Sequence, residues 1–318
     1  MTYQSVRFKK ICCILLIFLL SVSASGCGKK VIYADGDGSP AEAQAGPAGD
    51  QASPEEPQVT EAPPVRELSF TEEQTRAGDL ILVNADHAYD FEANADLPLT
   101  VIREAQTYDY PVSGEDMKLS SEIMPALDAM IRDCDEAMGT EYTSVSSAWR
   151  SEEYQQNVWD EMEELYGEEY AEKYVAVPGF SEHHTGLALD LGIIYEDESE
   201  GTFSESENAV WMAENAHHYG FVRRYAENKT EITGISNEAW HFRYVGIPHA
   251  AYMYANDLCL EEYLVRLKDT TSPEEPLSVE AEGRSWQIFY TDGPCPEPEG
   301  AYTVSGDNCG GVIVTVKL

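Results

Sequence analysis

Two short segments in the second half of the chain carry side chains that are suited to binding a metal ion. Residues 181–190 have the sequence SEHHTGLALD, and residues 238–241 have the sequence EAWH. Together they can supply two imidazoles and a carboxylate to one metal, with a further glutamate beside the last histidine. Three such ligands leave a fourth position on zinc open for water, and the extra glutamate can take the proton of that water. The sequence therefore predicts a zinc-dependent hydrolase.

The residues around these segments predict strands that would hold them in place. Leucines alternate with other residues over 187–191, which predicts a strand that buries the leucines on one face and points Asp190 to the other. Residues 241–245 predict a second strand, and residues 143–149 predict a third that delivers Arg150 at its end.

The rest of the chain alternates irregularly between helical and extended patterns. Apolar spacing and capping residues predict helices over residues 121–138, 152–174, 204–219 and 248–265. Further strands are predicted at 221–225, 232–235, 286–290 and 311–316. Without a regular strand–helix–strand repeat, this order predicts an α+β fold. We expect a small, mostly antiparallel sheet flanked by helices and carrying a single zinc site, with a short β-rich C-terminal appendage.

The N-terminus has the features of an exported bacterial protein. Basic residues at positions 7–10 precede an apolar run at 11–22, which is shorter than the roughly 20 residues needed to cross a bilayer. This pattern predicts a signal peptide over residues 1–26. Residues 24–27, ASGC, resemble the lipobox of bacterial lipoproteins, which implies lipidation of Cys27 and a membrane anchor. That pattern usually has leucine where this chain has alanine, so cleavage and secretion is the alternative.

Composition predicts four regions and excludes one class of partner. After the signal peptide, residues 27–69 are rich in proline, alanine, glycine and acidic residues, which predicts a disordered linker. A domain at 70–268 that carries the predicted zinc site and a small β appendage at 269–318 follow. The formal net charge of −38 repels phosphate backbones, so nucleic acid is not expected as a partner. Whether Cys27 is lipidated or the chain is secreted after signal cleavage, the catalytic domain would lie outside the cytoplasmic membrane.

The cysteines beyond the N-terminal region number four, which is an even number in an exported chain. Cys295 and Cys309 lie fourteen residues apart in the short C-terminal segment, where a disulfide would act as a staple. Cys134 has the alternative interpretation of a buried apolar residue on a helix.

The motif segments resemble the zinc-dependent VanY-type D-alanyl-D-alanine carboxypeptidases of the peptidase M15 group. The resemblance covers roughly residues 119–264. The pattern Ser-x-His-x-x-Gly-x-Ala-x-Asp is intact at 181–190, and the pattern Glu-x-Trp-His is intact at 238–241. A third block, SAWRS at 147–151, resembles the family's Ser-x-Tyr-Arg-Ser segment, with tryptophan where tyrosine is usual.

The resemblance implies a role for each residue of the site. It implies His183, Asp190 and His241 as the zinc ligands and Glu238 as the catalytic base. Arg150 would complement an anion, because its rigid fork suits a planar carboxylate. That anion is either the terminal carboxylate of the substrate or the developing oxyanion.

Three further residues in these blocks have competing interpretations. Ser181 and Gln155 are candidates for substrate contact, and their alternatives are a turn hydroxyl and an exposed helix amide. His184 adjoins His183 and could in principle bind the metal instead. Neighbouring side chains in an extended chain face opposite ways, so we expect His183 and not His184 to face the metal.

The resemblance implies that the enzyme removes the C-terminal D-alanine from peptidoglycan stem peptides. D,D-carboxypeptidase activity is favoured, but an L,D-carboxypeptidase or an endopeptidase would use the same zinc site, because pocket walls and not the metal motif set specificity. A different class is a non-catalytic surface lipoprotein that binds the cell wall. The presence of Glu238 argues against that class. No protein partner is predicted.

Overall fold

The strands that carry the motif residues belong to one antiparallel sheet. The computed structural model describes residues 66–139, 141–195 and 197–318, and these residues belong to a single compact unit. The predicted signal peptide, Cys27 and most of the predicted linker lie outside the described residues. Among the described residues, no helix is both long and apolar enough to span a membrane.

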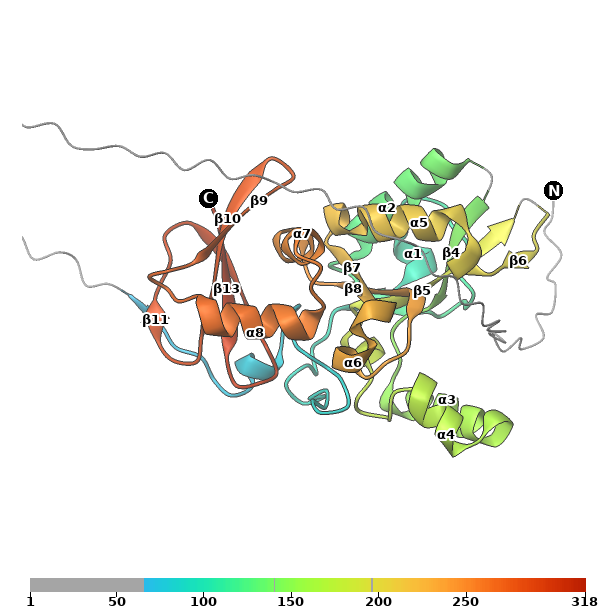
Figure 1. Cartoon of the computed structure of the whole chain (residues 1–318), viewed down its shortest axis with the longest axis horizontal. Helices are drawn as coiled ribbons and strands as arrows, with labels where there is room; N and C mark the ends of the chain where they lie inside the picture. The colour runs from blue at the N-terminus through green and yellow to red at the C-terminus, as the bar shows by residue number, and fades with distance from the viewer. Residues whose placement is uncertain (1–65, 140, 196) are drawn as a thin grey trace, which may run out of the picture. The chain divides into compact units, whose positions relative to one another are not determined.

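The central sheet has the strand order β4-β5-β8-β7, with the short β6 paired to β5 (Figure 1). Its strands are β4 (Glu141–Ser147), β5 (Ala188–Tyr195), β6 (Glu200–Gly201), β7 (Phe221–Tyr225) and β8 (Glu238–Tyr244). Every ladder within this sheet is antiparallel. The predicted α+β fold with a mostly antiparallel sheet is therefore confirmed. The predicted strand at 232–235 is wrong, because that segment forms the one-turn helix α6 (Thr230–Thr233) and ends at Gly234.

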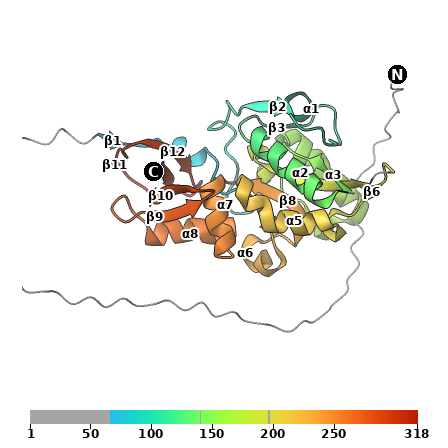
Figure 2. The same ribbon diagram turned by 90° about the horizontal axis from the view of Figure 1, so that it is seen from above.

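Two helices cover one face of the central sheet. They are α2 (Met124–Met138) and α5 (Glu207–Asn215), which lie next to each other over the strands (Figures 1 and 2). Leu189 on β5 is completely buried in the same apolar cluster as α2. Both helices begin three residues later than predicted. The hydroxyl of Ser206, not that of Ser204, caps α5, and a 3-10 turn at Phe203–Glu205 precedes it.

Two predicted helices are each divided into two. The stretch predicted at 152–174 forms α3 (Glu152–Tyr166) and α4 (Glu168–Tyr174), separated by Gly167, whose φ is 91°. The stretch predicted at 248–265 forms α7 (Ile247–Ala255) and α8 (Leu260–Thr270), with Asp257 in the left-handed region at φ 50°. A helix cannot continue through a residue in these conformations.

The C-terminal strands share a core with the helices that precede them. The second sheet has the order β12-β13-β10-β9. Its strands are β9 (Leu277–Ala281), β10 (Arg284–Thr291), β12 (Ala301–Gly306) and β13 (Val312–Lys317). Trp286 and Ile288 of this sheet belong to the same buried cluster as Leu264 of α8 and Leu80. The predicted boundary between residues 268 and 269 therefore passes through one apolar core.

Two short strand pairs and a one-turn helix lie outside the two larger sheets. The strand pairs are β1 (Glu67–Leu68) with β11 (Cys295–Pro296) and β2 (Leu99–Val101) with β3 (Lys118–Ser120), and the helix is α1 (Ile102–Ala105). The predicted disulfide is wrong, since Cys295 and Cys309 are both free thiols. Cys295 is buried in an apolar cluster with Val314, whereas Cys309 is exposed in the turn before β13. The pairing with β1 holds this segment instead.

Candidate active site

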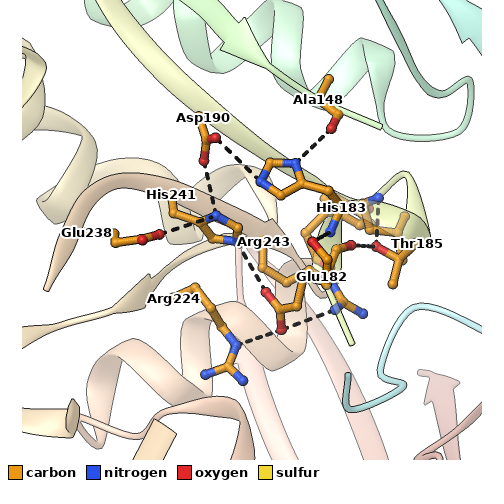
Figure 3. A network of polar contacts seen from close by, with 12 residues as sticks. Ala148, Glu182, His183, Thr185, Asp190, Arg224, Glu238, His241 and Arg243 are labelled. Atoms are coloured by element: carbon orange, nitrogen blue, oxygen red, sulfur yellow. Dashed lines mark hydrogen bonds and ion pairs between the residues drawn. The ribbon is translucent and has the colours of Figure 1, made fainter. Parts of the chain in front are cut away.

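Three metal-binding side chains meet at the centre of the sheet. Asp190 on β5 and His241 on β8 are direct partners in the antiparallel ladder. Oδ1 of Asp190 lies 3.0 Å from Nδ1 of His241, and Oδ2 lies 3.4 Å from Nε2 of His183. One donor atom from each of the three residues lies within 4.8 Å of the other two. The three predicted ligands therefore surround one point in space (Figure 3).

A short 3-10 helix, η2 (Glu182–Thr185), places His183. The hydroxyl of Ser181 accepts a hydrogen bond from the backbone N–H of His183 and caps this turn. Gly186 ends the turn at φ 66°, where a side chain would be strained and would approach Leu99. Residues 182–186 therefore form a tight turn that leads into β5, so that His183 and Asp190 face the same point.

The two imidazoles present different nitrogens to this point. Nδ1 of His183 donates to the backbone carbonyl of Ala148 at 2.7 Å, which leaves Nε2 facing Asp190. His241 has the opposite arrangement, since its Nδ1 faces Asp190 and its Nε2 contacts the carboxylate of Glu182 at 3.3 Å. Each ring therefore uses the nitrogen away from Asp190 to fix its orientation.

The chemistry of these donors fits zinc. Two imidazole nitrogens and one carboxylate are the ligand set of a catalytic zinc site with one open position. Burial lowers the pKa of His183 to about 4, so this ring is neutral at pH 7 and its lone pair is available. Burial alone would lower the pKa of His241, but hydrogen bonds to Asp190 and Glu182 raise it to about 9. Binding of a metal at Nδ1 would therefore release a proton.

Glu238 stands beside these donors at the start of β8. Its Oε2 lies 3.8 Å from Nδ1 of His241, and its side chain is only 13% exposed. Burial raises the pKa of Glu238 to about 7, although neighbouring His241 acts in the opposite direction. A carboxylate with a pKa near neutrality is well matched to accept and return a proton at pH 7.

Arg150 reaches the site from the loop after β4. Its Nη2 contacts Oδ2 of Asp190 at 3.1 Å, and Ser147 accepts from the same guanidinium. Oε1 of Gln155 accepts from Nη1 at 3.2 Å, while Nε2 of Gln155 donates to the carbonyl of Ala176. Gln155 is fully buried, so its interpretation as an exposed helix amide is wrong. In this arrangement Gln155 orients Arg150.

His184 has both of its ring nitrogens occupied away from the metal donors. Nδ1 donates to the carbonyl of Arg150 at 2.8 Å, and Nε2 accepts from the backbone N–H of Gly179 at 3.1 Å. The ring also packs against Tyr89 and Phe91. The expectation that His183 and not His184 faces the metal donors agrees with this arrangement.

One residue of the site was not singled out from the sequence. Glu182 lies inside the quoted motif, yet its side chain is completely buried beside His241 and two arginines, Arg224 and Arg243. The signal for it in the sequence is its position, because this charged residue lies between the capping Ser181 and the predicted ligand His183. Its partners lie more than forty residues away in the sequence, so their contact could not be predicted.

Comparisons with known proteins agree with this geometry. Residues 116–247 match the VanY family of D-alanyl-D-alanine carboxypeptidases. A D-alanyl-D-alanine carboxypeptidase of Enterococcus faecium is 35% identical over 257 residues, which cover 79% of each chain. The bifunctional D-Ala-D-Ala dipeptidase and carboxypeptidase VanXYC of Enterococcus gallinarum is 35% identical over 188 residues, covering 58% of this chain and 92% of that protein.

A solved structure extends the similarity to the fold. The vancomycin-resistance D,D-dipeptidase VanXYg, crystallised with a D-Ala-D-Ala phosphinate analogue, superposes with a TM-score of 0.69 at 30% identity. The match covers 80% of this chain and 99% of that one. The fold and the clustered donors define a hydrolase of the metallopeptidase class. The chain belongs to the VanY family of D-alanyl-D-alanine carboxypeptidases.

Proposed function

We propose that this enzyme removes the C-terminal D-alanine from peptidoglycan stem peptides that end in D-alanyl-D-alanine. The observation that carries the proposal is the position of Glu238, which lies buried at 3.8 Å from a nitrogen of the three-residue donor cluster. A binding module would need neither a base nor a metal. The names of the relatives support the substrate, since both Enterococcus proteins are D-alanyl-D-alanine carboxypeptidases.

We assign His183, Asp190 and His241 as the residues that would hold zinc. Their donor types and their approach to one point support this assignment. When bound, zinc polarises the scissile carbonyl and lowers the pKa of a water to about 7. The surrounding residues keep the two imidazoles oriented and exclude bulk water from the donors, since both histidine side chains are at most 5% exposed.

Glu238 is assigned as the general base and then the general acid. Its carboxylate accepts a proton from the attacking water and later gives that proton to the amine of the departing alanine. The pKa of about 7 suits both steps, because the group gains and loses a proton with little free-energy cost near neutral pH. D-Alanine leaves as the free amino acid.

Arg150 is assigned as the residue that binds a negatively charged group during the reaction. Its guanidinium is held by Ser147 and Gln155 and remains 17% exposed on the side chain, so it can meet a substrate group. That group is the terminal carboxylate or the developing oxyanion. Ser181 caps η2 with its hydroxyl, and a direct contact with substrate remains the sequence-based prediction for this residue and for Gln155.

The protein is further proposed to act at the cell wall, anchored to the outer face of the cytoplasmic membrane through a lipid on Cys27. The basic, apolar and small-residue pattern of the first 27 residues supports export and lipidation. The acidic linker that follows would let the catalytic domain reach wall peptides from the membrane. Secretion after ordinary signal cleavage is the alternative.

The proposed reaction is tested by mass spectrometry of muropeptides that carry tetrapeptide or pentapeptide stems. The purified protein is incubated with each stem, with and without a chelator. We expect the pentapeptide to lose one alanine, and the chelator to prevent this loss. Loss of alanine from the tetrapeptide instead would indicate an L,D-carboxypeptidase. If neither stem changes with zinc-loaded protein, the proposal is wrong, and cross-linked cell wall then distinguishes an endopeptidase from a binding module.

A further inference from the structure

The buried carboxylate of Glu182 lies behind His241, on the opposite side of the ring from the other metal donors. Oε2 of Glu182 is 3.3 Å from Nε2 of His241, and the Glu182 side chain is completely buried (Figure 3). We propose that Glu182 is a positioning residue that orients His241 with Nδ1 toward the metal. This inference rests on the proposed function, because it assumes that His241 binds zinc.

The contact with Glu182 gives the Nε2 proton of His241 an acceptor. When a metal occupies Nδ1, the ring carries its one proton on Nε2, and an ionised carboxylate at this position accepts it. The lone pair is then on Nδ1, the atom that lies 3.0 Å from Asp190 and 3.8 Å from Glu238. In the other tautomer Nδ1 would carry a proton and could not bind a metal. Carboxylates in this position also increase the basicity of the ligand.

Two arginines hold Glu182 in place without competing for the oxygen that faces His241. Nε of Arg224 donates to Oε1 at 2.8 Å, and Nη1 of Arg243 lies 3.4 Å from the same oxygen. Oε2 therefore remains for His241. All three charged side chains are fully buried. A carboxylate without water needs such cations to stay ionised, so the arginines make the contact with His241 possible.

The arginines are in turn fixed by distant parts of the chain. Arg224 makes a two-point contact with Glu261 on α8, at 2.8 and 2.6 Å. Arg243 donates from Nη2 to the backbone carbonyls of Asp79 and Ile81, at 2.9 and 3.1 Å. The orientation of His241 thus depends on a buried network that includes α8 and the backbone of residues 79–81.

Two matched variants of the full-length chain test this role, because Glu182 and Glu261 both neutralise Arg224 but only Glu182 contacts His241. Zinc affinity is measured by competition with a chelator, and thermal unfolding is followed in parallel. We expect Glu182→Gln to weaken zinc binding by about 10- to 100-fold, and Glu261→Gln, which keeps the contact between Glu182 and His241, to weaken it less. Unchanged affinity in Glu182→Gln, or an equal loss in both variants, overturns the inference. Failure of the unaltered protein to bind zinc would instead contradict the proposed function.

Glu182→Gln removes charge from a buried network, so a second measurement uses the unaltered protein. Proton–nitrogen NMR spectra of the histidine side chains in the zinc-loaded chain report which ring nitrogen is protonated. We expect His241 to carry its proton on Nε2, with slow exchange against solvent, and His183 to carry its proton on Nδ1. A proton on Nδ1 of His241, or rapid exchange at Nε2, contradicts the role of Glu182 even if the variant does not fold.

Discussion

Asp190 and His241 face each other directly across the antiparallel ladder of β5 and β8, with 3.0 Å between Oδ1 and Nδ1. Side chains opposite each other in such a ladder are about 4.5–5.5 Å apart at Cβ, which is close enough to share one ion. A slip of one residue would turn every side chain of a strand to the other face of the sheet. The metal site therefore depends on the register that the buried leucines of β5 set.

Glu238 can be tested separately from the metal donors. In Glu238→Gln the amide occupies the same space but cannot accept a proton. We expect kcat to fall by about 10²- to 10⁴-fold, while zinc stays bound, measured by stem-peptide turnover and metal analysis of the same samples. Glu231→Gln, an exposed change on α6, is the control and should leave both unaltered. Normal turnover in Glu238→Gln would remove the assigned base.

The role of Arg150 is tested with Arg150→Lys, which keeps the charge but removes the planar fork. We expect kcat/KM to fall by about 10²-fold, the scale of losing one preorganised donor. A rise in KM with kcat unchanged would indicate that Arg150 recognises the terminal carboxylate, and a fall in kcat would indicate that it stabilises the oxyanion. Arg266→Lys on α8, where the side chain is exposed, is the control. An unchanged kcat/KM would exclude both roles.

The sequence predicted the metal donors better than it predicted the helix boundaries and the buried contacts around them. Alternating leucines identified β5 and the direction of Asp190, and the motif spacing identified the donors that the fold brings together. The division of the predicted helix at Asp257 was not predictable, because left-handed backbone at a non-glycine residue depends on tertiary packing. The pairing of Glu182 with Arg224 and Arg243 depends on three-dimensional contact between segments distant in the sequence.

Gly186, the glycine of the motif at 181–190, should tolerate alanine less well than Gly234 does. Gly186 and Gly234 are both left-handed, with φ of 66° and 73°, so alanine costs about 1–2 kcal/mol at either position. A Cβ at Gly186 would also lie 3.1 Å from Leu99, whereas Gly234 has open space. We expect Gly186→Ala to lower the free energy of unfolding by about 1–3 kcal/mol more than Gly234→Ala. Urea unfolding measures both, and equal losses would contradict the steric argument.

The lipid anchor is tested with Cys27→Ser. Serine cannot form the thioether to lipid, so we expect the unaltered protein in the membrane fraction and the variant in the soluble fraction. Cell fractionation with immunodetection gives the distribution. Cys309→Ser is the control, because Cys309 is exposed but lies far from the signal in the sequence. Recovery of the unaltered protein mainly from the culture medium would support secretion instead.

His249 should make the protein less stable in acid. Its ring lies buried between Tyr263 and Thr315, with ring-to-hydroxyl distances of 2.7 and 3.1 Å, and burial lowers its pKa from 6.5 to about 3. Between these values the unfolded chain binds a proton and the folded chain does not. The free energy of unfolding should therefore fall as the pH drops from 6.5 towards 3, by up to about 1.4 kcal/mol per pH unit from this group. Urea unfolding at several pH values should give a shallower slope for His249→Gln, which cannot titrate, and parallel slopes for the two proteins would show that His249 is not the source of the acid sensitivity.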